Sequence, residues 1–171
     1  MARLPVWLTL TLLLSSLLIE NKALADHRAP ADARQQSPSQ VEQAIKRAVL
    51  DYIESQIQVK PELMARGLDK ALAKRTYWRD KAGNEKIVET SHDFMVELAN
   101  WYNKKGDKFS ANPRIEIDIY DIDQRVASVK LTVDKWIDYM HLYQNDQGQW
   151  KVLNVLWQYH DTNKHQSKAR Q

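Results

Sequence analysis

Residues 136–157, WIDYMHLYQNDQGQWKVLNVLW, decide the fold. Two runs rich in aromatic, β-branched and other apolar residues flank a short connection, Asn145-Asp146-Gln147-Gly148. Such runs on either side of a turn that contains glycine are typical of a β-hairpin. We therefore predict that this stretch forms the hairpin against which the rest of the domain packs, with its second strand running from Gln149 to about Tyr159.

Apolar and polar residues alternate between residues 113 and 133, which predicts two strands that each have one buried face. The apolar positions are Ile115, Ile117, Ile119, Ala127, Val129, Leu131 and Val133. Beyond Asp134 the large apolar residues move from odd to even positions. A β-bulge moves side chains to the opposite face within one strand, so we predict a bulge or sharp bend near Asp134 and Lys135 that curls the sheet around a hollow.

The segment before residue 113 has helical spacing in three places. Apolar residues recur every three or four positions over residues 40–57, behind a capping box of Ser39 and Glu42. Pro61 suits the first turn of a second helix, which we extend to about Lys74. Thr90 or Ser91 then caps a third helix. Its expected buried stripe is Phe94, Met95, Leu98, Trp101 and Tyr102.

A small hairpin is predicted between the second and third helices, over residues 76–80 and 86–89. Three helices followed mainly by antiparallel strands indicate the α+β class. We expect three N-terminal helices packed on a curved antiparallel sheet, which forms a cone with a pocket. Short turns predict a meander, whose concave side the helices cover.

The first 25 residues have the features of a secretory signal. Arg3 precedes an apolar run over residues 4–19, and a small-x-small site ends at Ala25, which predicts cleavage before Asp26. An uncleaved membrane anchor is the alternative, but the run is shorter than the ~20 residues that span a bilayer. Residues 26–38 are expected to be a flexible leader, 39–160 the domain and 161–171 a disordered tail. We expect a periplasmic or secreted protein without a membrane association after cleavage.

Charge, cysteine content and motifs exclude several classes of partner and site. Without Arg3, Lys22 and Glu20, the net charge of +3 becomes +2 and is spread along the chain, which argues against nucleic acid as a partner. The chain has no Cys, which excludes disulfides, thiolate metal sites and thiol nucleophiles. No nucleotide-binding or zinc-protease motif is present. We expect no cofactor.

Two motifs carry a resemblance to a known family. Trp136-x-Asp138-Tyr139-x-x-Leu142, followed by Gly148-x-Trp150-Lys151-Val152-x-Asn154-Val155-Leu156-Trp157, is similar to the putative lumazine-binding family. Residues 52–54 and 72–75 fit the same pattern, and the order of elements resembles the nuclear transport factor 2-like (cystatin-like cone) superfamily. The resemblance covers roughly residues 41–159. It implies a cone fold and homodimers that pair through the sheet face.

The chain departs from the family pattern at residues 69 and 70. Many relatives carry a His-Pro pair where this chain has Asp69 and Lys70, so a role carried by that His is absent here. The superfamily hosts enzymes, binding proteins and assembly domains on one scaffold, so the fold alone does not settle the function.

Asp138 is the sharpest candidate for chemistry. It is expected to share the concave face with Trp136 and Met140, where burial would raise the pKa of a carboxyl group and allow a role as general base or ligand acceptor. The alternative is a carboxylate on the solvent-exposed face, or one that binds a neighbouring backbone N–H or Lys. Asn154 interrupts an apolar strand and is expected to bond either a helix end or a ligand.

Aromatic residues are expected to line the pocket, and ordinary core packing is the alternative for each one singly. The predicted ligand-binding residues are Asp138, Asn154, Trp157, Trp136, Met140, Trp101, Tyr52 and Trp78, with Trp150 and Tyr102 as further candidates.

The histidines and the acidic turn are weaker candidates. We expect His141 and His92 to be exposed, and His160 to lie after the last strand, where it could close the pocket mouth. Asp118, Asp121 and Asp123 cluster at a turn and lack the pattern of a calcium loop, so no metal site is predicted.

Three functions remain open. The first is a binding protein for an unknown small organic ligand, and the second a dehydratase or isomerase that uses Asp138 as base. The third is a homodimeric interaction module with a vestigial pocket, for which Tyr139, His141 and Tyr143 are the surface residues to inspect.

Overall fold

The computed structural model describes residues 37–167. The predicted signal sequence, its cleavage site after Ala25 and all but the last two residues of the predicted leader therefore lie outside the described residues. Within residues 37–167, no helix combines the length and the apolar character needed to cross a membrane.

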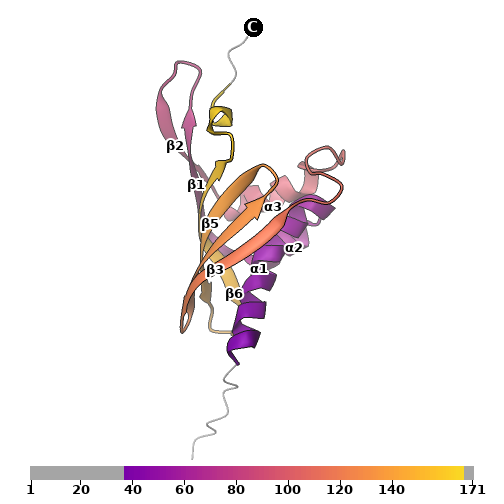
Figure 1. Cartoon of the computed structure of the whole chain (residues 1–171), viewed down its shortest axis with the longest axis vertical. Helices are drawn as coiled ribbons and strands as arrows, with labels where there is room; N and C mark the ends of the chain where they lie inside the picture. The colour runs from indigo at the N-terminus through magenta and orange to yellow at the C-terminus, as the bar shows by residue number, and fades with distance from the viewer. Residues whose placement is uncertain (1–36, 168–171) are drawn as a thin grey trace, which may run out of the picture. The chain divides into compact units, whose positions relative to one another are not determined.

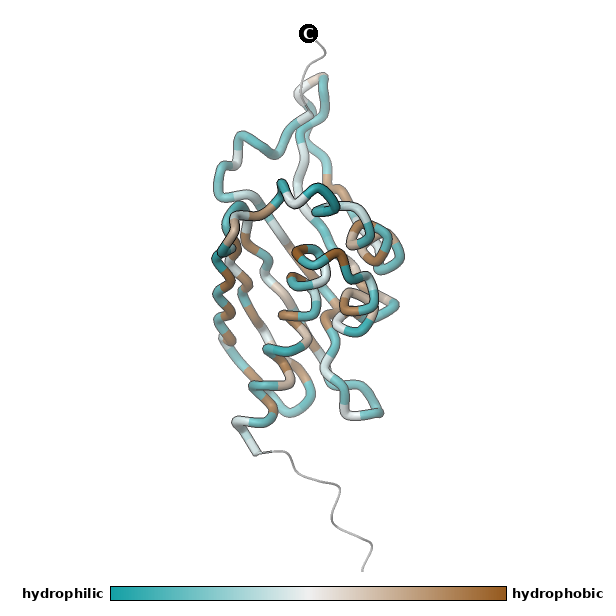
Figure 2. The backbone as a smooth tube through the Cα atoms, turned by 90° about the vertical axis from the view of Figure 1, so that its right-hand side faces the viewer, coloured by the Kyte–Doolittle hydropathy of each residue, from teal (hydrophilic) through white to brown (hydrophobic). Residues whose placement is uncertain are grey.

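Three α-helices, six strands and one short 3-10 helix make up the domain (Figure 1). They are α1 (Pro38–Gln58), α2 (Pro61–Gly67), β1 (Leu68–Arg79), β2 (Glu85–Thr90), α3 (His92–Trp101), β3 (Ile115–Asp123), β4 (Val126–Val133), β5 (Trp136–Gln144), β6 (Trp150–Tyr159) and η1 (Thr162–Lys164). The strands form one curved sheet in the order β2-β1-β6-β5-β4-β3, and the helices lie on one side of it (Figure 2). The predicted α+β class is confirmed.

The predicted hairpin of residues 136–157 is confirmed as β5 and β6, which pair antiparallel around the turn that contains Gly148. Gly148 has a φ of 76°, a left-handed conformation that glycine adopts at no steric cost. The register shifts once in this pair. His141 faces Asn154 and Leu142 faces Val152, so Leu153 is an extra residue in β6. This bulge reverses the faces of the residues that follow it.

Near Asp134 and Lys135 the predicted sharp bend is found, whereas its alternative, a bulge within one strand, is wrong. These two residues form the turn between β4 and β5, and Leu131 pairs with Asp138 across it. Directly paired residues of an antiparallel ladder share a face. The turn therefore places the odd-numbered apolar residues of β4 and the even-numbered residues of β5 on the same inner face.

The second helix is shorter than predicted, because it ends at Gly67 and residues 68–79 form β1. The inward positions in the centre of β1 are Leu72, Lys74 and Thr76, which are all buried. Two of these three residues are polar, so the apolar alternation that marks a strand is missing. β1 pairs parallel with β6 and antiparallel with β2. The sheet is therefore mixed, and only β3 to β6 form the predicted meander.

The helices begin close to their predicted positions. The capping box of α1 is formed by Ser37 and Gln40, instead of the predicted Ser39 and Glu42, because the helix starts two residues earlier. Ser91 caps α3 through its side chain, as one of the two predicted alternatives. The predicted stripe of α3 is partly wrong, since Phe94 and Trp101 are about half exposed.

The core lies between the helices and the inner face of the sheet. Its largest fully buried members come from α1, α2, β1, β4, β5 and β6. At Gly67 the end of α2 touches α1 so closely that an added Cβ would lie 2.6 Å from the Ala48 carbonyl oxygen. Arg66 clamps the same junction with two hydrogen bonds of 2.6 and 2.7 Å to the buried Asp51.

The segment after β6 differs from the predicted disordered tail over residues 161–167. Thr162–Lys164 form η1, and the backbone of Arg79 bonds both His165 and Ser167. His165 is buried. This part of the tail therefore packs along β1.

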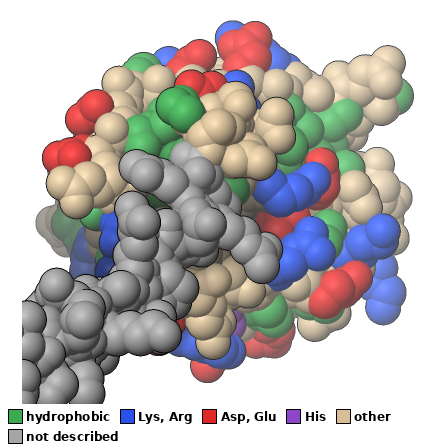
Figure 3. Space-filling view, turned by 90° about the horizontal axis from the view of Figure 1, so that it is seen from below, with side chains coloured by type: hydrophobic (Ala, Val, Ile, Leu, Met, Phe, Trp, Pro, Cys, Tyr) green, Lys and Arg blue, Asp and Glu red, His purple; other side chains and the backbone are tan. Residues whose placement is uncertain are grey.

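Charges of both signs are mixed on the surface. On the part of the face in Figure 3 that the grey residues leave visible, basic and acidic side chains lie next to one another.

Candidate functional site

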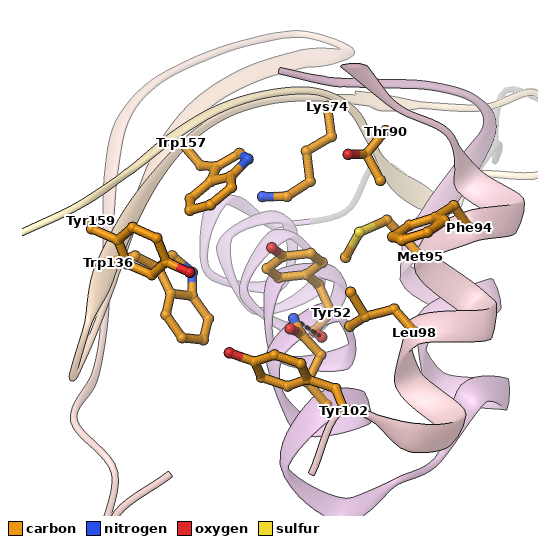
Figure 4. A pocket seen from close by; sticks show the side chains of 11 residues that line it. Tyr52, Lys74, Thr90, Phe94, Met95, Leu98, Tyr102, Trp136, Trp157 and Tyr159 are labelled. Atoms are coloured by element: carbon orange, nitrogen blue, oxygen red, sulfur yellow. Dashed lines mark hydrogen bonds between the residues drawn. The ribbon is translucent and has the colours of Figure 1, made fainter. Parts of the chain in front are cut away.

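A small aromatic pocket lies on the inner side of the sheet, against α1 and α3 (Figure 4). Its volume is about 190 Å³. It is lined by Tyr52, Gln56, Lys74, Thr90, Phe94, Met95, Leu98, Tyr102, Trp136, Trp157 and Tyr159, and we call this set the aromatic pocket. Phe94 is 49% exposed, so the pocket reaches the surface beside α3.

One buried ion pair lies in the wall of the aromatic pocket. Lys74 Nζ lies 2.6 Å from Oδ1 of Asp138, and both residues are buried. The other carboxylate oxygen, Oδ2, accepts a hydrogen bond of 2.7 Å from the indole N–H of Trp136. Tyr52 donates a longer one, 3.3 Å, to Oδ1. Asp138 is thus held by three residues that line the pocket, and it lies behind them with no exposed surface.

The ammonium group of Lys74 faces two aromatic rings. It lies 4.9 Å from the ring centroid of Trp157 and 5.4 Å from that of Tyr52, within the range of cation–π attraction. Figure 4 shows the amine pointing between these side chains into the pocket. An ammonium group has three N–H donors, and Asp138 is its hydrogen-bond partner among the described residues. Donors therefore remain for a ligand.

Burial changes the acid–base behaviour of the pocket. It lowers the pKa of Lys74 below 10.5, and the charge of Asp138 opposes that shift. Burial and the nearby carboxylate of Asp138 raise the pKa of Tyr52 well above 10.0. Burial also raises the pKa of Tyr102 and of Tyr159. The three phenols are therefore neutral hydrogen-bonding groups near neutral pH.

Four of the predicted site residues lie together. Tyr52, Trp136 and Trp157 line the aromatic pocket, and Asp138 lies directly behind them. Tyr102, a further candidate, also lines it. The predicted sharing of a face by Asp138, Trp136 and Met140 is correct, since all three are buried on the inner side of β5.

Three other predicted aromatic or apolar residues do not line the aromatic pocket. Met140 is buried in the core. Trp101 is half exposed and contacts Tyr102 edge-on with 6.4 Å between ring centroids. Trp78 lies near the C-terminal segment and donates its indole N–H to the hydroxyl of Ser167. Trp150, a further candidate, is also buried in the core.

The placement of Asn154 in the pocket is wrong. It pairs with the exposed His141 and lies with it on the outer side of the sheet, where both border a different hollow. The extra residue Leu153 is the cause. Without that bulge, Asn154 would share the inner face with Val152.

Sequence reasoning missed several residues of the pocket. The most consequential is Lys74, which was assigned to a helix, so its side chain could not be placed opposite Asp138. Gln56, Thr90, Phe94, Met95, Leu98 and Tyr159 complete the list. Because two of the three inward residues in the centre of β1 are polar, no apolar alternation marks this part of the strand in the sequence.

The histidines differ in environment. His141 is exposed, as predicted, whereas His92 is 3% exposed and the prediction for it is wrong. His92 precedes Asp93, and its Nδ1 lies 2.8 Å from that carboxylate. The side chain of His160 bonds the carbonyl oxygen of Val133 and does not line the aromatic pocket.

His165 holds the C-terminal segment against the pocket wall. Its Nε2 accepts a hydrogen bond of 2.7 Å from the backbone N–H of Tyr159, which leaves Nδ1–H to donate to the carbonyl oxygen of Tyr77 at 3.1 Å. The ring is stacked on Tyr77 and lies 5.3 Å from Trp157 and 5.1 Å from Tyr159 between ring centroids. Two walls of the aromatic pocket are thus buttressed by one neutral imidazole.

The acidic turn was not predicted to bind metal. Asp118, Asp121 and Asp123 are exposed. Over residues 37–167, no group of three or more His, Cys, Asp or Glu side chains is arranged to hold a metal ion.

The comparisons with known proteins agree on the fold. The model of the family described as putative lumazine-binding matches residues 40–158. A solved NTF2-like protein of unknown function from Shewanella baltica OS155 is 17% identical, with a TM-score of 0.56 over 73% of this chain and 98% of that chain. Another from Silicibacter pomeroyi DSS-3 is 12% identical, with a TM-score of 0.56 over 72% and 99%. Among curated proteins, none matches the sequence. The chain therefore has the nuclear transport factor 2-like fold.

Removing one member of the buried ion pair should lower the free energy of unfolding more than removing both members. Asp138→Asn or Lys74→Met alone leaves one buried charge unpaired, and each should cost about 3–5 kcal/mol in the free energy of unfolding. The double variant should recover a large part of that loss. Urea unfolding of the four proteins measures the coupling.

The exposed pair between Arg75 on β1 and Glu89 on β2 is the matched control, because its side chains are 46% and 58% exposed. Arg75→Met and Glu89→Gln should show a coupling of no more than about 1 kcal/mol. Additive losses in the Lys74 and Asp138 variants would contradict the role assigned to the buried pair.

The stability of the domain should depend on pH through His165. Burial lowers the pKa of His165 below 6.5, so just below that pH the unfolded chain binds more protons than the folded one. The contribution is fully present above pH 6.5 and is lost as the pH falls towards the folded pKa. Urea unfolding over a pH series should show a steeper loss for the natural protein than for His165→Gln, which does not titrate. Parallel curves would contradict this assignment.

Proposed function

The chain belongs to the family described as putative lumazine-binding, and we propose that it binds a small, planar, uncharged aromatic molecule that carries a carbonyl oxygen. The observation that carries the proposal is the position of the Lys74 ammonium group. It is buried among aromatic rings and has N–H donors that Asp138 does not use. A carbonyl oxygen would accept from it, and a flat ring would pack between Trp157 and Tyr52.

The charge balance of the pocket favours an uncharged ligand. Lys74 and Asp138 neutralise each other at 2.6 Å, and the tyrosines that line the aromatic pocket are neutral. A ligand with a net charge would bring an unpaired charge into a largely apolar site, which is costly. Lumazine, a planar pteridine with carbonyl groups, has the chemistry that the pocket calls for.

The size of the pocket limits the ligand to one or two rings. A volume of about 190 Å³ exceeds the roughly 150 Å³ of an apolar cavity that binds benzene. It is below the range of about 300–1,000 Å³ that is typical of sites for drug-sized molecules. A larger ligand would have to extend out of the pocket through its open side at Phe94.

Catalysis by Asp138 as a general base has less support than binding. A general base must reach the proton that it removes, directly or through a water molecule. Asp138 has no exposed surface, and Lys74, Trp136 and Tyr52 separate it from the pocket.

We further propose that the protein is exported to the periplasm or secreted, with residues 1–25 removed. The support is the apolar run over residues 4–19 and the small-x-small site that ends at Ala25. Amino-terminal sequencing of protein purified from its natural host tests this, and a first residue other than Asp26 would argue against the assigned site.

A ligand titration tests the binding proposal. We expect lumazine or a one-ring carbonyl compound to change the tryptophan fluorescence of the protein with saturation. Trp157→Leu should weaken binding on the order of tenfold, because a ring that packs on the ligand is lost. Trp101→Leu is the matched control, since Trp101 lies outside the aromatic pocket, and should leave the affinity unchanged. Equal effects of the two substitutions would overturn the assigned site.

The outer sheet face supports a homodimer as a second proposal. Tyr120, Tyr139 and Leu156 are 58%, 46% and 57% exposed there, and the rings of Tyr120 and Tyr139 lie 6.4 Å apart. Large exposed apolar side chains that lie together mark interaction surfaces. Of the residues singled out from sequence, His141 is exposed beside them, whereas Tyr143 donates its hydroxyl to Asp69.

Light scattering after gel filtration should give the mass of a dimer for the natural protein. Leu156→Asp should shift it to the monomer, because a charge would be buried in the interface. Ile87→Asp, at a 66% exposed position of β2, is the control and should leave the dimer intact. If the natural protein is a monomer, the dimer proposal is overturned and the ligand-binding proposal is unaffected.

A further inference from the structure

We propose that Lys74 Nζ condenses with the carbonyl carbon of a small aromatic aldehyde or ketone held in the aromatic pocket, forming an imine. The proposal rests on the proposed function, because it concerns the same pocket and gives its ligand a reactive class. Nothing in the binding proposal requires a covalent bond, so the two can fail separately.

The position of the amine is the first argument. Of the described residues that line the aromatic pocket, Lys74 is the only lysine, and its side chain is 7% exposed. Its Nζ projects from the centre of β1 between Trp157 and Tyr52, where the carbonyl group of a bound ring would meet it (Figure 4). A desolvated amine in an apolar pocket is a typical setting for Schiff-base chemistry.

The reaction conserves the buried charge balance. An ammonium ion and a carbonyl compound give a protonated imine and one molecule of water, so a single positive charge is present before and after. Asp138 is ionised before and after the reaction and remains the counter-ion at the same place. The Trp157 and Tyr52 rings that attract the ammonium group would attract the iminium group as well. No buried charge is left unpaired at the end of the reaction.

Asp138 also supplies a route for the proton. Its Oδ1 lies 2.6 Å from Lys74 Nζ and can accept a proton from the ammonium group. The freed nitrogen lone pair then forms the C–N bond while the carbonyl π electrons move to oxygen. The proton returned by Asp138 and a second proton from nitrogen convert that oxygen to water, which leaves as the C=N bond forms. Condensation needs no oxidant and no reductant.

Two further properties of the site agree with this chemistry. Burial lowers the pKa of Lys74, which favours the neutral amine. The volume of about 190 Å³ suits a one-ring carbonyl compound. Benzaldehyde is therefore a suitable probe, and benzamide is its matched counterpart, with the same ring and a carbonyl group that does not form imines.

The test is reductive trapping on the full folded domain. Substoichiometric benzaldehyde with cyanoborohydride at neutral pH converts each imine into a stable secondary amine, and peptide mass mapping locates the added benzyl group. We expect Lys74 to carry most of the label, several-fold more than the exposed Lys81. Unfolding in urea before labelling should abolish the preference for Lys74. This control uses the natural protein, so it does not depend on the folding of a variant.

Variants and benzamide separate the possible outcomes. Lys74→Arg keeps the charge beside Asp138 and should remove the labelled site, whereas Lys81→Arg should leave it unchanged. Benzamide should change the tryptophan fluorescence when it binds, and it should slow the labelling of Lys74. Binding of benzamide with label spread over the exposed lysines would overturn the imine and leave the binding proposal standing. Failure of both compounds to bind would overturn both proposals.

Discussion

The buried contact between Lys74 and Asp138 is the constraint on which the inner face of this sheet depends. The two residues are 64 positions apart in the chain, on β1 and β5, with β6 between their strands. Each charge is tolerable in the interior only because the other is 2.6 Å away. Correct placement of β1 beside β6 therefore determines whether the carboxylate on β5 is paired. The same contact orients Trp136 and Tyr52, which donate to Asp138 and line the aromatic pocket.

The neutral, rigid character of the aromatic pocket follows from this arrangement. Charges are present in its wall, yet they cancel, and the phenols around them are protonated because burial and Asp138 raise the pKa of Tyr52. His165 adds support from behind, with both ring nitrogens used for backbone groups of Tyr77 and Tyr159. A ligand would thus meet side chains whose orientations are already fixed, which reduces the entropy cost of binding.

Sequence patterns predicted those parts of the fold in which side-chain character follows burial. The alternation in β4 and β5 and the apolar face of α1 placed those elements close to where they lie. Residues 76–79 of β1 were predicted as part of the small hairpin, but residues 68–74 were assigned to the second helix, because the inward Lys74 is polar and its burial depends on a partner distant in the chain. Asn154 was misplaced for a different reason, since one extra residue at Leu153 reverses the faces of β6. The inner-face position of Asp138 was predicted correctly, but the cation that pairs with it could not be identified without the first part of β1.

The parallel pairing of β1 with β6 has a consequence for the order of folding. Lys74 and Val155 are neighbours in the sheet although 81 residues separate them, so the loop they close contains most of the domain. Contacts of such long sequence separation form late and slow the folding of small domains. While the chain is being synthesised, the β1–β2 hairpin and the helices can form early, but they have no sheet to join until residue 150 and beyond have emerged. During that interval one edge of β1 has no partner, and the nascent chain is most exposed to aggregation.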